Sequence, residues 1–224
     1  MARFSRVEVI LKMQGAGMVP VFYNKDPEIC KSVIKSCFDG GVRVFEFTNR
    51  GDFAHELFGE LNKWAATEIP DMVMGAGSIV DAGTTSLYIQ LGTNFVVSPV
   101  LNVAMARVCN RRKILWSPGC GSLSEISYAE ELGAEIVKIF PGPAVGGPDF
   151  VKAVKGPCPW TSIMPTGGVE PTRENLAEWF KSGVTCVGMG SKLISSDIIQ
   201  GKDWKGLTRK VADTMSIIKA LINN

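Results

Sequence analysis

Eight short apolar runs recur along the chain, with amphipathic segments between them. The runs are nearly continuous in apolar residues rather than strictly alternating, which is typical of strands covered on both faces. Parallel strands with helices packed outside them have this character. Eight such units favour an α/β fold, specifically a (β/α)8 TIM barrel, over an open sheet. The runs are residues 18–23, 42–47, 72–79, 95–101, 114–120, 136–140, 162–166 and 186–190.

Helix-forming patterns fall between these runs. Asp26 precedes a proline and a glutamate, which is typical of a helix start, and the glycines at 40–41 end that helix. Asp52 is expected to cap a second helix, and residues 122–125 form a capping box for a third that stops at Gly133. Further helices are expected at 6–13, just before the first strand, and at 174–180 and 204–221.

Length and charge narrow the class of protein. The chain has 224 residues, of which 46% are hydrophobic, and a single barrel domain over residues 1–224 fits the roughly 200–250 residues of such folds. A net charge of +2 is too small to create a broad positive electrostatic field that would attract nucleic acid or an acidic membrane. The densest basic cluster, residues 111–113, is interpreted as a solvated loop. With no signal-peptide features and no apolar run of about 18 residues, we expect a cytoplasmic protein.

Cysteine and histidine usage limits the chemistry further. The six cysteines include no C-x-x-C pair and favour buried free thiols in a reducing compartment over disulfides or zinc ligands. His55 is the one histidine, which argues against a multi-histidine metal site and against a histidine-dependent catalytic triad as the basis of the chemistry. Catalysis must therefore come mainly from lysine, glutamate, arginine, hydroxyl groups and the backbone.

Two charged residues interrupt strands that should be apolar. Glu46 and Lys138 each lie near the end of an apolar run. An unpaired buried charge is costly, so each needs a partner or a change of protonation. The pair could be a structural ion pair, or either side chain could reach solvent. Alternatively, apolar surroundings favour a neutral lysine amine that attacks a ketone, with the carboxylate moving protons.

Other polar groups follow the strand ends, where TIM barrels carry their active sites. Arg50 is suited to bidentate binding of a carboxylate, although an outward salt bridge is the alternative. The glycines at 75–78 allow a ligand to approach the backbone, and Ser78 adds a hydroxyl. The glycine-rich stretches 165–168 and 188–191 are phosphate-binding candidates, or simply two tight turns.

Together these residues resemble the 2-keto-3-deoxy-6-phosphogluconate (KDPG) aldolase family, which also includes 4-hydroxy-2-oxoglutarate aldolases. The resemblance extends over nearly the whole chain, and the order of the motifs across successive strands is what makes it specific. The matching motifs are residues 19–21, 40–50, 75–78, 97–99, 117–119, 137–141, 165–168 and 188–191.

The resemblance implies a homotrimer that needs no metal or organic cofactor and acts on a small 2-keto acid. It places the Schiff-base lysine at Lys138 and the general acid and base at Glu46. The residues implied in substrate binding are Arg50, Ser78, Thr48, Pro99, Phe140, Thr166, Gly167, Gly168, Gly190 and Ser191.

The expected reaction is cleavage of KDPG to pyruvate and glyceraldehyde 3-phosphate, with 4-hydroxy-2-oxoglutarate as a further substrate. The galactonate epimer of KDPG, a phosphosugar isomerase or epimerase on the same barrel, and a non-catalytic sugar-acid binding protein are the alternatives. The chain departs from the family pattern at Ser78, Asn49, Val100 and Lys192. Lys192 either adds a cation beside the phosphate or points outward. Because of these departures, the resemblance defines the pyruvate-binding half of the site better than the half that selects the aldehyde.

Overall fold

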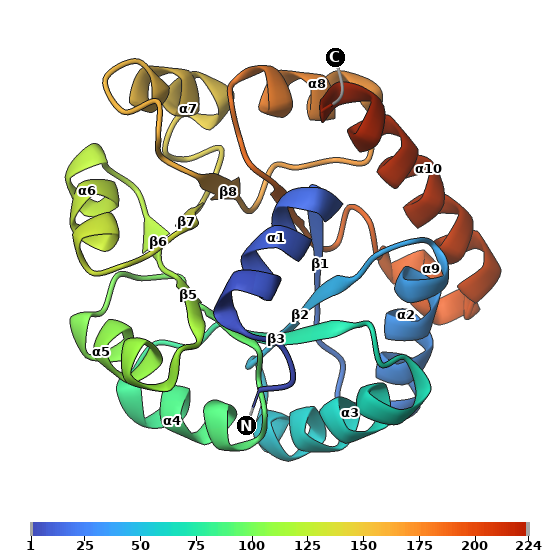
Figure 1. Cartoon of the computed structure of the whole chain (residues 1–224). Coiled ribbons are helices and arrows are strands. Elements are labelled where there is room, and N and C mark those ends of the chain that lie inside the picture. Colours follow the sequence, from blue (N-terminus) through green and yellow to red (C-terminus); the bar gives the residue numbers. More distant parts are fainter. Residues whose placement is uncertain (1, 223–224) are drawn as a thin grey trace.

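Parallel strands form a barrel with helices packed around its outside (Figure 1). The computed structural model describes residues 2–222. One hydrogen-bonded sheet has the order β5-β4-β3-β2-β1-β9 and a second has the order β6-β7-β8. A bridge between Thr166 and Gly188 joins the β8 side to β9. The strands are β1 (Met18–Phe22), β2 (Val44–Thr48), β3 (Val73–Gly77), β4 (Phe95–Val97), β5 (Leu115–Ser117), β6 (Gly119–Cys120), β7 (Val137–Ile139), β8 (Ile163–Pro165) and β9 (Val187–Met189).

β5 and β6 are two parts of one barrel strand. Pro118 separates them because a proline has no N–H group to donate to the ladder. Its carbonyl still accepts a hydrogen bond from the backbone nitrogen of Lys138, at 2.8 Å. β5 pairs with β4, and β6 pairs with β7. The segments therefore make eight barrel strands, one in each predicted apolar run, and the predicted (β/α)8 barrel is confirmed.

The helices form a ring around the strands, except for α1, which lies across one end of the barrel (Figure 1). Their apolar faces cover the outward side of the strands, where Phe45, Phe47 and Trp116 are buried. The helices are α1 (Arg6–Ala16), α2 (Pro27–Asp39), α3 (Ala54–Glu68), α4 (Ala82–Gln90), α5 (Val103–Arg112), α6 (Leu123–Glu131), α7 (Gly147–Lys155), α8 (Arg173–Lys181), α9 (Ser196–Gly201) and α10 (Trp204–Ile222).

Each helix expected from the sequence is present, but two of the expected caps are not formed as predicted. The prediction for Asp52 was wrong: α3 follows Phe53, whose backbone is left-handed (φ 59°), and no side chain caps this helix. Ser122 does cap α6, accepting from the nitrogen of Glu125. The Glu125 carboxylate, however, accepts from the Gly121 backbone nitrogen at 2.8 Å and from the Ser122 hydroxyl at 3.1 Å, and not from the Ser122 backbone nitrogen that a capping box requires.

The barrel interior at the N-terminal ends of the strands is filled by one apolar layer. Val9 and Met13 of α1 complete it, and both are fully buried. Because side chains alternate along a strand, the residue two places beyond each member of this layer also points into the interior. The strand-side members are Val19, Val44, Val73, Phe95, Val97, Leu115, Ile136, Met164 and Cys186.

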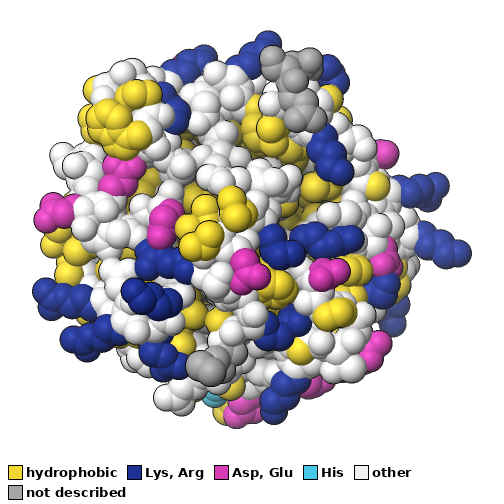
Figure 2. All heavy atoms as spheres, viewed as in Figure 1, with side chains coloured by type: hydrophobic (Ala, Val, Ile, Leu, Met, Phe, Trp, Pro, Cys, Tyr) yellow, Lys and Arg dark blue, Asp and Glu magenta, His cyan; other side chains and the backbone are white. Residues whose placement is uncertain are grey.

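The face that carries α1 has positive and negative side chains interspersed around a small hydrophobic patch (Figure 2). Val7 and Leu11 on α1 are exposed there. The basic residues 111–113 are exposed as expected, but the prediction of a loop was wrong, because α5 continues through Arg112 and Lys113 caps it. Within residues 2–222, no helix has the length and apolar character needed to cross a membrane.

Candidate active site

Glu46 and Lys138 both point into the barrel just above the apolar layer. Glu46 follows Val44 by two residues on β2, and Lys138 follows Ile136 by two residues on β7. The two charges predicted as strand anomalies therefore occupy equivalent interior positions, from strands that do not neighbour each other in the barrel.

The Glu46 carboxyl group is fully buried, and neither of its oxygens has a hydrogen-bond partner. Burial raises the pKa of this group above its ordinary value, and the positive charges of Lys138 and Arg50 partly oppose that rise. A buried carboxyl group with a raised pKa and unused hydrogen-bonding capacity can take up and release a proton. These are the properties of a general acid and base.

Lys138 is buried, with 5% of its surface exposed, and its Nζ lies 4.9 Å from the centre of the Phe140 ring. Within the described chain, no ion pair joins Lys138 to Glu46 within the 4.0 Å limit for such a contact. A structural ion pair is therefore not the reason for these two charges. The Lys138 amine lies beside an aromatic wall formed by the Phe140 ring.

Three buried hydroxyl groups on interior-facing positions also lack hydrogen-bond partners. They belong to Thr48 on β2, Ser117 on β5 and Thr166 after β8. Buried polar groups are nearly always satisfied, so unsatisfied ones gathered in one interior indicate that water or a ligand supplies the missing partners. This polar layer is the clearest feature that separates the upper barrel from its apolar lower half.

A cavity of about 500 Å³ opens at the C-terminal ends of β1, β8 and β9. Seven of the predicted substrate-binding residues line it, together with several that the sequence did not single out. The lining residues are Val21, Phe22, Tyr23, Arg50, Phe140, Thr166, Gly167, Gly168, Val169, Gly188, Gly190, Ser191, Lys192 and Ile194.

Arg50 stands at the edge of this cavity beside Ser78. The Arg50 Nε donates to the Ser78 hydroxyl at 3.4 Å, and Ser78 has a left-handed backbone (φ 59°) that turns it toward the arginine. Asn49, the residue before Arg50, instead accepts a hydrogen bond from Tyr88 of α4 at 2.9 Å. A polar residue at position 49 is thus explained by packing against a helix rather than by substrate.

Pro99, Thr48 and Ser78 do not line the cavity. Pro99 packs at the end of β4, where its backbone occupies the space next to Gly119 on the neighbouring strand. Thr48 lies deeper, in the polar layer.

The glycines of β3 have a different role from the one the sequence suggested. We expected residues 75–78 to admit a ligand to the backbone. The space beside Gly75 is filled by the Phe95 ring, and the space beside Gly77 is filled by the Glu46 carboxylate. These glycines therefore make room for protein side chains.

The loops after β8 and β9 form the outer part of the cavity. Gly167 and Gly168 have left-handed backbones (φ 87° and 70°), which explains why both are glycine. Lys192, whose direction the sequence left open, lines the cavity and forms an ion pair with Glu170 at 2.8 Å.

Val21, Tyr23 and Ser117 were not among the residues predicted for the site. Strand alternation could have identified all three, because Val21 and Tyr23 follow Val19, and Ser117 follows Leu115, at two-residue steps. Of these three residues, Ser117 is the best candidate to contact a ligand, because its buried hydroxyl has no hydrogen-bond partner.

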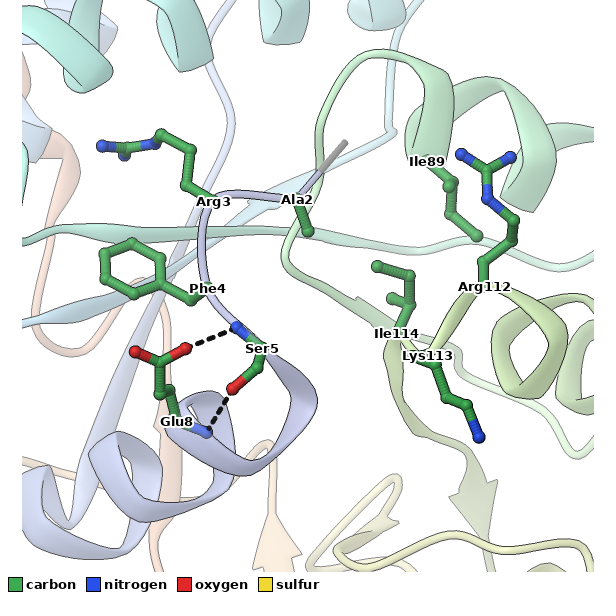
Figure 3. Close-up of a pocket in the computed structure, with 9 residues that line it drawn as sticks. All are labelled: Ala2, Arg3, Phe4, Ser5, Glu8, Ile89, Arg112, Lys113 and Ile114. Carbon is green, nitrogen blue, oxygen red and sulfur yellow. Dashed lines mark hydrogen bonds between the residues drawn. The ribbon is translucent and has the colours of Figure 1, made fainter.

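A second cavity, of about 400 Å³, lies at the opposite end of the molecule, between the N-terminal segment and the end of α5 (Figure 3). Three of its polar side chains are already bonded within the protein: Ser5 and Glu8 bond to each other as the cap of α1, and the Arg3 guanidinium donates to two backbone carbonyls. Arg112 and Lys113 extend away from each other in Figure 3. This cavity contains no acid–base pair.

No cluster of three or more His, Cys, Asp and Glu side chains in the described part of the chain is arranged to hold a metal ion. His55 lies on α3, partly buried.

Comparison with known proteins agrees with this geometry. The family model described as KDPG and KHG aldolase, where KHG is 4-hydroxy-2-oxoglutarate, matches residues 9–210. The 2-dehydro-3-deoxy-phosphogluconate aldolase of Pseudoalteromonas atlantica is 34% identical over 192 residues, covering 85% of this chain and 86% of that protein. The KHG/KDPG aldolase of Escherichia coli K12 is 31% identical, covering 86% of this chain and 87% of that protein.

A solved structure gives the same answer for the fold. KDPG aldolase from Legionella pneumophila, captured with pyruvate as a covalent carbinolamine, superposes with a TM-score of 0.82 at 25% identity. The match covers 92% of this chain and 97% of that one. The buried lysine and glutamate of the barrel therefore sit in a sequence with close aldolase relatives, and the chain belongs to the KDPG and KHG aldolase family of carbon–carbon lyases.

Proposed function

We propose that this chain is a class I aldolase in which Lys138 forms a Schiff base with KDPG and releases pyruvate and glyceraldehyde 3-phosphate. The observation that carries the proposal is the burial of two ionisable groups inside one barrel: Lys138, and Glu46, whose carboxyl oxygens have no hydrogen-bond partner. The relatives named above support this substrate, and the carbinolamine captured in the Legionella enzyme supports the covalent step. A single domain over residues 1–224 carries the whole activity.

The covalent steps follow from the positions of these two groups. The neutral amine of Lys138 attacks the C2 ketone, and Glu46 moves protons as the carbinolamine loses water to form a protonated imine. Glu46 then accepts the C4 hydroxyl proton. The C3–C4 bond breaks, its electron pair passes to the imine to give an enamine, and the aldehyde leaves.

The same two groups complete the cycle. The enamine is protonated at C3, water adds to C2 of the resulting imine, and the amine of Lys138 leaves as pyruvate is released. Arg50 binds the carboxylate of the keto acid, which fixes the distance between ketone and amine. Ser78 supports Arg50. Thr48, Pro99, Phe140 and Thr166 shape the pyruvate half, and Gly167, Gly168, Gly190 and Ser191 bind the phosphate.

Borohydride reduction with labelled pyruvate tests the covalent step. We expect a stable adduct on the peptide that contains Lys138, and none in a Lys138→Arg variant. The exposed Lys152 of α7 serves as an internal control, because it must remain unlabelled. Absence of an adduct on Lys138 would contradict the Schiff-base mechanism and would favour an isomerase or epimerase.

A substrate panel tests the identity of the aldehyde. Pyruvate release is measured with KDPG, its galactonate epimer and KHG, since the name of the E. coli relative covers both KDPG and KHG. We expect the highest kcat/KM with KDPG. We also expect a homotrimer in the cytoplasm; a mass of three chains in light scattering is the outcome that supports the trimer.

A further inference from the structure

Two loops meet at the outer end of the cavity, and a single ion pair joins them. Glu170 belongs to the loop between β8 and α8, and Lys192 belongs to the loop between β9 and α9. The Lys192 Nζ lies 2.8 Å from the Glu170 carboxylate. Lys192 also lines the cavity itself.

The backbones that carry this pair are held in place independently of the ion pair. The Glu170 N–H donates to the Asn175 side chain at 2.8 Å, and Asn175 donates in turn to the carbonyl of Gly168 at 3.2 Å. The carbonyl of Lys192 accepts a hydrogen bond from Lys210 of α10 at 2.7 Å. Loss of the ion pair would therefore leave both loops fixed, and the side chains alone would be free to change partner.

The side chains of the pair are solvent-accessible, with 61% of Lys192 and 42% of Glu170 exposed. An ion pair between exposed groups contributes little to stability, because water and salt screen it. A doubly charged phosphate forms stronger charge-assisted hydrogen bonds to an ammonium group than a single carboxylate does. An incoming phosphate can thus replace Glu170 as the partner of Lys192.

The charges that line the cavity fit a ligand with an anion at each end. Arg50 and Lys192 are the only charged residues among the described residues that line it. They follow β2 and β9, the two strands that flank β1. A keto acid whose carboxylate meets Arg50 would place its other end toward Lys192.

We propose that Lys192 selects substrates with an anionic tail and that Glu170 is its built-in competitor, released when the tail binds. This proposal rests on the proposed function and adds to it the two residues that set the preference for a phosphorylated tail. Glu170 lowers the affinity for phosphate, and Lys192 raises it.

Steady-state kinetics with a matched pair of substrates test this selection. KDPG and the same sugar acid without phosphate are compared in the natural protein and in Lys192→Gln, Glu170→Gln and Lys152→Gln variants. Lys152 is the matched control, because it is an exposed lysine that is ion-paired to Asp149 at 3.1 Å and lies outside the cavity.

Lys192→Gln should raise KM for KDPG roughly 5- to 20-fold, leave kcat within about twofold, and leave the unphosphorylated substrate unaffected. Glu170→Gln should lower KM for KDPG roughly two- to fivefold. Lys152→Gln should change neither. Equal changes in KM for both substrates, or no change in Lys192→Gln, would overturn the proposal.

Inorganic phosphate provides a probe that does not depend on turnover. Phosphate should raise the melting temperature of the natural protein and of the Glu170→Gln variant, but much less that of Lys192→Gln. Equal stabilisation of all three would overturn the proposal. If no pyruvate is released from either substrate, the proposed function fails, and this binding measurement still decides the role of Lys192.

Discussion

The carboxylate of Glu46 occupies the space that any side chain at position 77 would need, directly beside Gly77 on the neighbouring strand. We predict that Gly77→Ala displaces this carboxylate while leaving the barrel folded, because the overlapping atoms are the end of a flexible side chain. A displacement of about 1 Å at a reacting group costs on the order of 100-fold in rate. We expect kcat to fall by about that factor, as measured by pyruvate release.

Gly15→Ala is the matched control for this prediction. Gly15 is exposed on α1, and nothing lies within 4 Å of an added methyl group. The change should leave kcat unaltered and stabilise the helix by roughly 0.5–1 kcal/mol. A normal kcat in Gly77→Ala would mean that the position of Glu46 is not critical.

Glu46→Gln should lower kcat by roughly 10²- to 10⁴-fold, because the amide cannot exchange protons as a carboxyl group does. The borohydride adduct on Lys138 should still form, although more slowly. Mass spectrometry of the reduced protein, together with kcat, separates loss of proton transfer from loss of the nucleophile.

The same substitution should make the fold more stable at alkaline pH. The pKa of Glu46 is raised in the folded state above its ordinary value of 4.5, so the folded protein binds more protons than the unfolded chain. The contribution of Glu46 to stability is therefore fully present below pH 4.5 and is lost as the pH rises through the folded-state pKa of this group. Glu46→Gln removes this loss.

Chemical unfolding at two pH values measures the effect. We expect Glu46→Gln to exceed the natural protein by about 1–3 kcal/mol in free energy of unfolding at pH 8. The difference should shrink at pH 5, near the ordinary pKa of the group. A difference that grows toward acid pH would show that Glu46 is ionised and stabilising in the fold.

Arg50→Lys should weaken binding of the keto acid, because lysine cannot form the two parallel hydrogen bonds that a guanidinium offers a carboxylate. We expect KM to rise about 10-fold for every substrate in the panel, with or without phosphate. Arg107→Lys on the exposed side of α5 is the control and should be neutral. An unchanged KM would place Arg50 outside the binding site.

The six cysteines should all be free, and only one should react quickly in the folded protein. Five are buried, and Cys158 is partly exposed. Burial raises the pKa of Cys30, Cys109, Cys120 and Cys186 to about 12, so little reactive thiolate exists at neutral pH. A thiol reagent should modify about one group rapidly in the native protein and all six after unfolding.

The strands and the two central charges were predictable because they depend on strong local patterns. An apolar run interrupted by one charge stands out without knowledge of its neighbours, and this alone identified Glu46 and Lys138. The break at Pro118 changed the strand into two segments but did not alter its place in the barrel.

Helix starts were harder to predict, because several polar residues compete for the same role. Asp52 has the right chemistry for a cap, yet the N-cap of α3 is the next residue, Phe53, which has a left-handed backbone, and the helix begins at Ala54. α4 went unnoticed because its first half, residues 82–86, is rich in glycine, threonine and serine, which are poor helix formers. Its cap by Asp81 and its packing in the barrel form it nonetheless.

Contacts between residues far apart in the sequence could not be predicted from the sequence alone. The Glu46 side chain fills the space beside Gly77, and Glu170 forms an ion pair with Lys192. Both contacts depend on which strands and loops lie side by side in the barrel. The sequence showed that Glu46 and Lys192 were unusual, but it did not show which residues they contact. Their roles became visible only once the barrel brought them together.

The apolar layer completed by Val9 and Met13 of α1 closes one end of the barrel. Reactants bound inside can then enter and leave only through the opening at the other end. In the mechanism proposed above, the aldehyde lies nearer this opening than the imine, and it would therefore depart before pyruvate in the direction of cleavage. In the direction of synthesis pyruvate would bind first, and an aldehyde that entered before it would block access to Lys138.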